Sequence, residues 1–353
     1  MDAIDAITEI VPEREGGRFA RPPFSTLLSL PGRTCPPGAR SGLLSVERRG
    51  LRARFGPREI QLRWAVWRPA LATRGTVCVF HGRTEFIEKY YEVVEDLLVR
   101  GFTVATLDWR GQGGSSRLRG GTGPGGHGHV TSFSEYIDDL SAFMRQVVYP
   151  HCPAPHFALS HSMSGPVMLL AAARRRPFWF ERVVLSAPML RLPLPVLGPR
   201  GLRGLAGSMS SAGLGGMPVG RSRHNEPEAA FAGNALTSDR RRFLTARAMT
   251  DAAPALAVGP PTVGWLSAAA RAMDQCFDLR LPRRVQVPVL FVGAACDTVV
   301  STRATEELAR RMRSASYVMI PNAKHEILME RDALRDQFWS AFEAFVPGDP
   351  TGL

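Results

Sequence analysis

The chain has 353 residues, 44% of them hydrophobic and 22% charged, an ordinary globular composition for one large domain or two small ones. This excludes a mostly disordered, fibrous or disulfide-scaffold protein. The formal net charge of +12 can indicate a polyanion or an anionic membrane as partner, but only two of the 44 basic residues, Lys89 and Lys324, are lysines.

The predicted elements are strands that alternate with helices along the chain. Residues 1–40 are rich in proline and lack periodicity, which predicts an irregular N-terminal arm. Residues 60–67 alternate between apolar and polar, as a half-exposed strand does. Short apolar runs predict further strands at 76–80, 102–107, 156–159, 183–185, 289–292 and 317–320. Apolar residues at helical spacing predict helices at 88–100, 133–148, 167–174, 305–312 and 332–345.

This alternation predicts the α/β class, with a mostly parallel central sheet and helices on both faces. The alternation lapses between residues 189 and 281, where the chain is rich in Gly, Pro, Met and Arg. We therefore expect a core formed by residues 41–188 and 282–346, a cap inserted at 189–281 and a C-terminal tail at 347–353.

The segment 157–165 (FALSHSMSG) runs from an apolar strand through small residues into a helix, with Ser162 at the turn. Such a turn exposes a serine hydroxyl above the sheet, and the helix N-terminus behind it stabilises negative charge. In the usual pattern, G-x-S-x-G, glycine stands where this chain has Ser160 and Ser164, and Gly165 comes one residue later. By itself the motif is weak, because serine-rich strand ends are common turns.

A nucleophilic serine needs a general base, and the base needs an acid that orients it. Asp297 and His325 each follow a predicted strand, where sites form in open α/β sheets. The chain order Ser162, Asp297, His325 is that of α/β-hydrolases. Asp274 and Asp278 are the weaker alternatives for the acid.

Acyl transfer also needs hydrogen-bond donors for the developing oxyanion. We expect them to be the backbone N–H groups of Met163, next to the nucleophile, and of Arg83, in the loop after the strand 76–80. Gly82 lets this loop approach the nucleophile closely. His81 is expected to brace the loop rather than to bind a metal or act as a base.

The cysteines favour neither a disulfide frame nor a metal site, because the five are scattered without Cys-x-x-Cys or Cys/His ligand spacing. The first residues lack the basic and apolar regions of a signal peptide, and prolines and glycines interrupt the uncharged stretch 252–270. A cytoplasmic protein is therefore expected. The arginine bias, with 34 Gly and 28 Pro, indicates GC-rich coding rather than a nucleic-acid partner.

Three segments resemble the bacterial lysophospholipase and monoacylglycerol lipase branch of the α/β-hydrolase superfamily, a branch of serine aminopeptidase-type hydrolases. They are 81–116 (HGRTEFIEKYYEVVEDLLVRGFTVATLDWRGQGGSS), 160–165 (SHSMSG) and 322–330 (NAKHEILME). The resemblance covers roughly residues 45 to 346. It implies an α/β-hydrolase fold with a helical cap and no cofactor.

The same resemblance implies residue roles: Ser162 as nucleophile, Asp297 as acid, His325 as base, and Arg83 and Met163 as the oxyanion hole. Asp108, in the D-x-R-G-x-G-x-S pattern, is structural in the family. Ser164 stands where the family usually has glycine, and we expect the fold to tolerate it.

The predicted cap mixes apolar residues with arginine: residues 191–250 contain nine arginines and three acidic residues. We expect Leu190 and Trp265 to contact the substrate, a lysophospholipid or monoacylglycerol met at an anionic membrane surface such as the inner membrane. One alternative is a serine peptidase or amidase of the same fold, which would need an acidic patch for a free amine. Another is a catalytically silent binding protein, which a complete triad disfavours.

Overall fold

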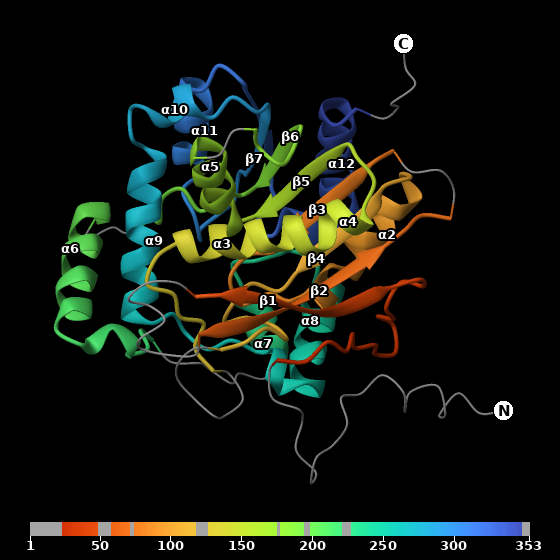
Figure 1. Cartoon of the computed structure of the whole chain (residues 1–353), viewed down its shortest axis with the longest axis horizontal. Coiled ribbons are helices and arrows are strands. Elements are labelled where there is room, and N and C mark those ends of the chain that lie inside the picture. Colours follow the sequence, from red (N-terminus) through yellow and green to blue (C-terminus); the bar gives the residue numbers. More distant parts are fainter. Residues whose placement is uncertain are drawn as a thin grey trace, which may run out of the picture.

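The computed structural model describes residues 23–48, 58–70, 74–117, 126–174, 177–193, 198–220 and 227–347. One eight-stranded sheet runs through the molecule (Figure 1). Its strands are β1 (Arg40–Glu47), β2 (Glu59–Trp67), β3 (Thr76–Phe80), β4 (Thr103–Leu107), β5 (His156–His161), β6 (Arg182–Ser186), β7 (Val289–Ala294) and β8 (Ala315–Ile320). Their order is β1-β2-β4-β3-β5-β6-β7-β8, and only β1–β2 and β2–β4 are antiparallel pairs, which confirms a mostly parallel sheet.

Helices cover both faces of the sheet (Figure 1). Outside the segment between β6 and β7 they are η2 (Ile87–Tyr90), α2 (Tyr91–Val99), α3 (Ser134–Phe143), η3 (Met144–Val148), α4 (Tyr149–His151), α5 (Ser164–Arg174), α11 (Thr302–Arg311), η6 (Ile327–Met329) and α12 (Asp332–Phe345). Strand β3 shows why an all-apolar run suits the centre: Val77 and Val79 pack with α2 and α12, whereas Cys78 and Phe80 pack with α3 and α5.

The segment between β6 and β7 adds helices and no strand of the sheet among its described residues. These are α6 (Gly198–Ser211), η4 (Leu214–Gly216), α7 (Pro227–Ala232), α8 (Arg240–Ala252), η5 (Pro254–Leu256), α9 (Val263–Cys276) and α10 (Leu281–Arg284). We call residues 189–281 the inserted segment. It contacts loops at the carboxyl ends of strands: Leu236 O accepts from Glu326 N, and Gly259 O accepts from the Arg83 side chain.

Several element predictions need correction. The single helix expected at 88–100 is a 3₁₀ turn, η2, followed by α2, and the helix expected at 133–148 changes to π geometry at η3. Strand β1 was not anticipated, although it pairs with β2 along its whole length. Strand β2 is more buried than half-exposed, because β1 and β4 flank it and Arg63 on it is fully enclosed.

The described part of the predicted arm, residues 23–39, contains one isolated bridge, Leu30–Arg33, and no helix or strand. Phe24, Leu27 and Leu28 in it are buried against the core. Residues 1–22 of the arm and 348–353 of the tail lie outside the described residues.

Candidate active site

Ser162 lies in the turn between β5 and α5, with a backbone φ of 52°. The left-handed region is unfavourable for a non-glycine residue, and surrounding bonds hold it there. Ser162 N donates to Ser186 O, while Ser162 O accepts from Gly165 N and Met189 N. Strained serines at such turns direct the hydroxyl away from the sheet.

Two glycines permit this turn. A Cβ on Gly165 would lie 2.5 Å from Pro188 Cβ, and a Cβ on Gly82 would lie 3.1 Å from Ser162 Cβ. Ser164 is fully buried, and its hydroxyl lies 2.7 Å from Ser160 Oγ and 2.8 Å from both Phe80 O and His161 O. The close approach therefore falls at Gly165, one residue beyond the position of the usual glycine.

The structure brings Ser162, His325 and Asp297 into one chain of hydrogen bonds. His325 Nε2 lies 2.9 Å from Ser162 Oγ, and His325 Nδ1 lies 2.7 Å from Asp297 Oδ2. The other carboxylate oxygen, Asp297 Oδ1, accepts from the backbone N–H groups of Val299 and Val300 at 2.7 and 2.9 Å. The Asp297 carboxylate is thus held by two backbone N–H groups while its other oxygen contacts the imidazole.

The alternative acids Asp274 and Asp278 lie elsewhere, at the end of α9 and just after it. The carboxylate of Asp278 accepts from Arg280 N.

The loop after β3 carries the expected second oxyanion donor. Within the described part of the chain, the backbone N–H groups of Arg83 and Met163 donate no hydrogen bond. The N–H groups on either side of Arg83 are held: Gly82 N donates to Glu85 Oε2 at 2.5 Å and Thr84 N donates to Gln112 Oε1 at 2.6 Å. The loop is therefore rigid around an N–H that is left for another acceptor.

The two expected substrate contacts, Leu190 and Trp265, are both buried in the apolar cluster that also contains Met163. The Trp265 indole N–H donates to Tyr136 Oη at 3.1 Å, and the Arg83 guanidinium lies 5.0 Å from the centre of its ring. Burial lowers the pKa of Arg83 to about 10. Trp265 thus lies beside the loop that carries Arg83, and Leu190 belongs to the same apolar cluster.

Two further histidines lie at the strand ends. The His161 ring is 4.9 Å from that of His325, and burial, with His325 and Lys89 nearby, lowers the pKa of His161 to about 4. His81 Nδ1 lies 2.8 Å from Gly82 O, and its Nε2 lies 3.2 Å from Asp108 Oδ1.

Asp108 itself accepts from Arg63 Nε, Ile87 N and Gly114 N at 2.7, 3.0 and 2.7 Å. Its oxygens thus join a strand, a helix start and a loop, which are contacts of a structural residue.

Sequence reasoning missed a buried ionic group beside the site. Lys89 Nζ lies 2.7 Å from Glu85 Oε1 and 2.6 Å from Glu326 Oε1, and all three side chains are at least nine-tenths buried. The one available signal was compositional, since a lysine is rare in this arginine-rich chain. Position 326 is also next to the expected base.

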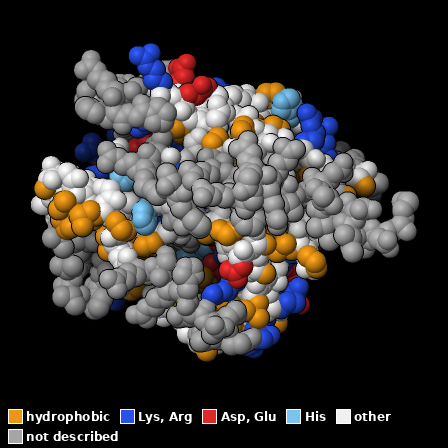
Figure 2. All heavy atoms as spheres, turned by 90° about the horizontal axis from the view of Figure 1, so that it is seen from below, with side chains coloured by type: hydrophobic (Ala, Val, Ile, Leu, Met, Phe, Trp, Pro, Cys, Tyr) orange, Lys and Arg blue, Asp and Glu red, His pale blue; other side chains and the backbone are white. Residues whose placement is uncertain are grey.

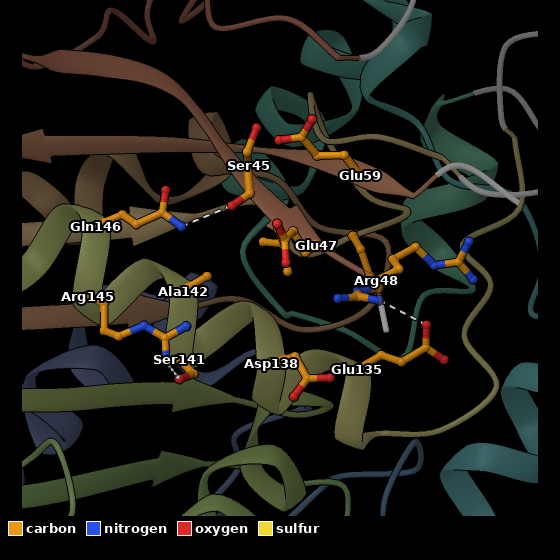
Figure 3. A pocket seen from close by; sticks show the side chains of 12 residues that line it. Ser45, Glu47, Arg48, Glu59, Glu135, Asp138, Ser141, Ala142, Arg145 and Gln146 are labelled. Carbon is orange, nitrogen blue, oxygen red and sulfur yellow. Dashed lines mark hydrogen bonds and ion pairs between the residues drawn. The ribbon is translucent and has the colours of Figure 1, made fainter. Parts of the chain in front are cut away.

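An open polar pocket of 1010 Å³ lies in another part of the molecule, between β1 and the α3–η3 helix (Figure 3). No triad residue lines it. Figure 3 shows that the Gln146 side chain donates to Ser45 O of β1, and that the Arg145 side chain donates to Ser141 Oγ one turn earlier in the helix. Within the described ranges, no group of three or more His, Cys, Asp or Glu side chains could hold a metal ion.

A mostly parallel eight-stranded sheet whose loops bring together a serine, an aspartate and a histidine, in that order along the chain, defines the class of α/β-hydrolases. The family model described as "Serine aminopeptidase, S33" matches residues 72–332, and the chain belongs to that family.

Named relatives agree with this assignment. Lysophospholipase L2 of Escherichia coli (strain K12) is 32% identical over 269 residues, which are 73% of this chain and 76% of the relative. Probable lysophospholipase L2 of Haemophilus influenzae is 27% identical over 287 residues, 79% of this chain and 86% of the relative. A soluble variant of monoglyceride lipase from Saccharomyces cerevisiae, solved with a substrate analog, superposes with a TM-score of 0.66 at 17% identity, over 87% of this chain and 96% of that one. The structural likeness confirms the predicted fold.

Proposed function

We propose that the protein is a serine hydrolase that cleaves carboxylic esters of lipid-like substrates, with Ser162 as nucleophile, His325 as base and Asp297 as acid. The observation that carries the proposal is the chain of two hydrogen bonds, 2.9 Å from serine to histidine and 2.7 Å from histidine to aspartate. A base within this reach can take the serine proton as the hydroxyl attacks.

The proposed reaction has two steps. Ser162 Oγ attacks the ester carbonyl while His325 Nε2 takes its proton, and Asp297 stabilises the resulting imidazolium. The N–H groups of Arg83 and Met163 donate to the oxyanion. The alcohol leaves with the proton from His325, and water, activated by the same base, then releases the carboxylic acid from the acyl-serine.

A lysophospholipid or a monoacylglycerol is the proposed substrate. This is supported by the names of the relatives in E. coli and yeast and by the apolar cluster that contains Leu190, Met163 and, beside Arg83, Trp265. The family description names an aminopeptidase, which makes a peptidase the second candidate. The excess of arginine in the inserted segment disfavours it, since a cationic amine would be repelled.

Hydrolysis of p-nitrophenyl esters of increasing chain length, beside the matching p-nitroanilides, tests this function. Ser162→Ala should abolish ester turnover, and His325→Ala should lower it by about 10³-fold or more because the base is gone. Asp297→Asn should lower ester turnover by as much as His325→Ala or by less. Undiminished activity of Ser162→Ala would refute the assignment, and cleavage of anilides alone would favour the peptidase.

We further propose that the end of the molecule around η4 contacts an anionic lipid surface, at the cytoplasmic face of the inner membrane. Residues 204–220 contain no charged side chain, and Leu214, Met217 and Val219 in this stretch are exposed. Hydrophobic side chains gather at the left end of Figure 2, the end at which Figure 1 draws α6.

The sequence surrounds this apolar stretch with cations. Arg200 and Arg203 precede it, and Arg221 and Arg223 follow it. An exposed apolar stretch with arginines before and after it in sequence suits the boundary between anionic head groups and acyl chains. None of the helices in the described parts of the chain has the length and apolar character to cross a bilayer.

A further inference from the structure

Lys89 lies between two buried carboxylates, those of Glu85 and Glu326, that belong to different parts of the site. The residues of this group, Glu85, Lys89 and Glu326, are hereafter the buried bridge. The contact between positions 89 and 326 joins segments 237 residues apart in sequence. A buried ammonium with two carboxylates at 2.6–2.7 Å forms strong charge-assisted hydrogen bonds.

One end of the buried bridge holds the oxyanion loop. Glu85 Oε1 accepts from Lys89, and Glu85 Oε2 accepts from Gly82 N at 2.5 Å and from Tyr90 Oη at 3.0 Å. Gly82 N belongs to the peptide unit just before the one that carries the N–H of Arg83. The position of Glu85 therefore sets the direction in which the Arg83 N–H points.

The other end holds the loop of the proposed base. Glu326 follows His325 directly, and its backbone N–H donates to Leu236 O of the inserted segment at 2.8 Å. Its carboxylate is turned toward Lys89. Lys89 thus joins the loop of the base to the loop of the oxyanion hole.

The buried bridge also carries charge. Although burial opposes it, Lys89 and the nearby His161 and His81 lower the pKa of Glu85, whereas burial raises the pKa of Glu326 against the effect of Lys89. With both glutamates ionised, the bridge has a net charge of −1.

Two titratable side chains of the described residues contact the His325 imidazole ring: Asp297 after β7 and His161 at the end of β5. The side chain of the adjacent Lys324 donates to Asn234 O.

We propose that Lys89 is a positioning residue of the proposed ester hydrolase: through Glu85 and Glu326 it fixes the oxyanion loop relative to His325, and the bridge supplies a negative charge that favours the imidazolium of His325. The inference rests on the proposed roles of His325 and Arg83. It assigns no contact between Lys89 and substrate.

The geometric part is tested with Lys89→Met, which keeps an unbranched side chain of nearly the same length and removes the ammonium group. We expect kcat per titrated active-site serine to fall about 10- to 100-fold with little change in KM, because a displacement near 1 Å has that cost. Lys89→Arg should recover most of the loss. The concentration of active sites is measured by titrating the serine with a phosphonate ester, so that unfolded protein does not enter the value of kcat. A kcat per site within threefold of the wild type in Lys89→Met would overturn this part.

The electrostatic part is tested by titrating the His325 imidazole by NMR, its signal identified by its absence in His325→Ala. Glu326→Gln changes the net charge of the bridge from −1 to 0, so the midpoint should move to lower pH by about half a unit or more. Lys89→Met/Glu326→Gln restores −1 and should return the midpoint toward that of the wild type. Tyr90→Phe removes a hydrogen bond without changing charge and should leave the midpoint in place.

An unchanged midpoint in Glu326→Gln, or no return in the double variant, would overturn the electrostatic part. This titration needs no substrate, so it decides the inference even if no ester is turned over. Conversely, ester hydrolysis lost in Ser162→Ala and unaffected in Lys89→Met would reject the inference and leave the proposed function intact.

Discussion

Ser164 stands where the usual pattern has glycine, two residues after Ser162, and its surroundings explain how the turn accommodates it. The side chain is fully buried, but its hydroxyl has Ser160 Oγ, Phe80 O and His161 O within 2.8 Å. A buried hydroxyl with such partners avoids the desolvation cost of an unpaired one. The contact that forbids a side chain lies at Gly165 instead.

Replacing Ser164 by the family residue therefore separates stability from activity. Ser164→Gly should lower the free energy of unfolding by about 1–2 kcal/mol, because it removes buried hydrogen bonds and adds backbone freedom at the start of a helix. Ester turnover should stay within about threefold of the wild type. Denaturant unfolding and p-nitrophenyl ester kinetics measure the two effects. A tenfold gain in activity would mean that the hydroxyl obstructs the oxyanion hole.

For single residues, local sequence and chain order were enough to predict that Ser162, Asp297 and His325 lie close together. Each stands beside a strand end, and strand ends of a parallel sheet share one edge. The partners of Lys89 could not be found in this way. Its contact with Glu326 depends on how two loops from distant strands meet, and no local periodicity records such a meeting.

At the scale of elements, predictions held where the apolar pattern was strong and failed where tertiary contacts decide. Helix α12 has the predicted bounds, 332–345, whereas β1 was missed because its burial alternates weakly and depends on pairing with β2. The change to π geometry at Met144–Val148 leaves the apolar spacing almost unchanged, so periodicity does not reveal it.

Helix α8 of the inserted segment is anchored to the core by a cluster of ionic contacts, in addition to the apolar contacts of Met249. The Arg242 side chain is almost fully buried and contacts the carboxylates of Glu92 on α2, Asp332 on α12 and Asp239 at its own helix start. Burial alone would raise the pKa of Glu92, but Arg242, Arg335 and Arg33 lower it to about 2.

Arg242→Met should therefore lower the free energy of unfolding by about 2 kcal/mol near neutral pH, since it removes the charge-assisted hydrogen bonds of a buried cation and leaves Glu92 with its other partners, among them Arg33 and Arg335. The folded-state pKa of Glu92 is depressed from 4.5, so its stabilisation is present above pH 4.5 and is lost as pH falls toward about 2. The difference in free energy of unfolding between the wild type and Arg242→Met should therefore become smaller as the pH falls from 4.5 toward about 2. Urea unfolding as a function of pH measures it.

An exposed ion pair provides the control for this change. Arg310 pairs with Glu306 one helical turn away on α11, with its side chain 78% exposed. Arg310→Met should cost less than about 1 kcal/mol at any pH. A loss as small in Arg242→Met would mean that apolar packing, not the ionic cluster, holds α8.

For the whole molecule, the net charge of +12 does not by itself describe the charge that the surface presents to a partner. Some arginines are internal and paired with carboxylates: Arg63 contacts Glu88 and Asp108, and Arg110 contacts Glu135 and Asp139. Such residues neutralise buried acids and present no field to a partner. The proposed lipid contact therefore depends on the arginines that precede and follow the uncharged stretch 204–220 in sequence, not on the total charge.

The proposed lipid contact can be tested on that surface with matched variants. Leu214, Met217 and Val219 are 42%, 47% and 43% exposed, and three apolar residues elsewhere, Val99, Leu279 and Met319, are 87%, 84% and 52% exposed. Replacing the first three by serine should lower binding to vesicles by about tenfold or more, because it removes the apolar area that inserts. Serine at the other three positions should leave binding unchanged.

The electrostatic share of this binding is separable by lipid composition. Co-sedimentation should be stronger with vesicles that contain phosphatidylglycerol than with phosphatidylcholine alone, and the difference should shrink as salt shortens the screening length to about 3 Å near 1 M. Equal binding to neutral and anionic vesicles would show that the arginines do not contribute to binding and that the apolar contact alone accounts for it. Equal losses in the two triple variants would instead show that general surface hydrophobicity, not the end of the molecule around η4, drives association with lipid.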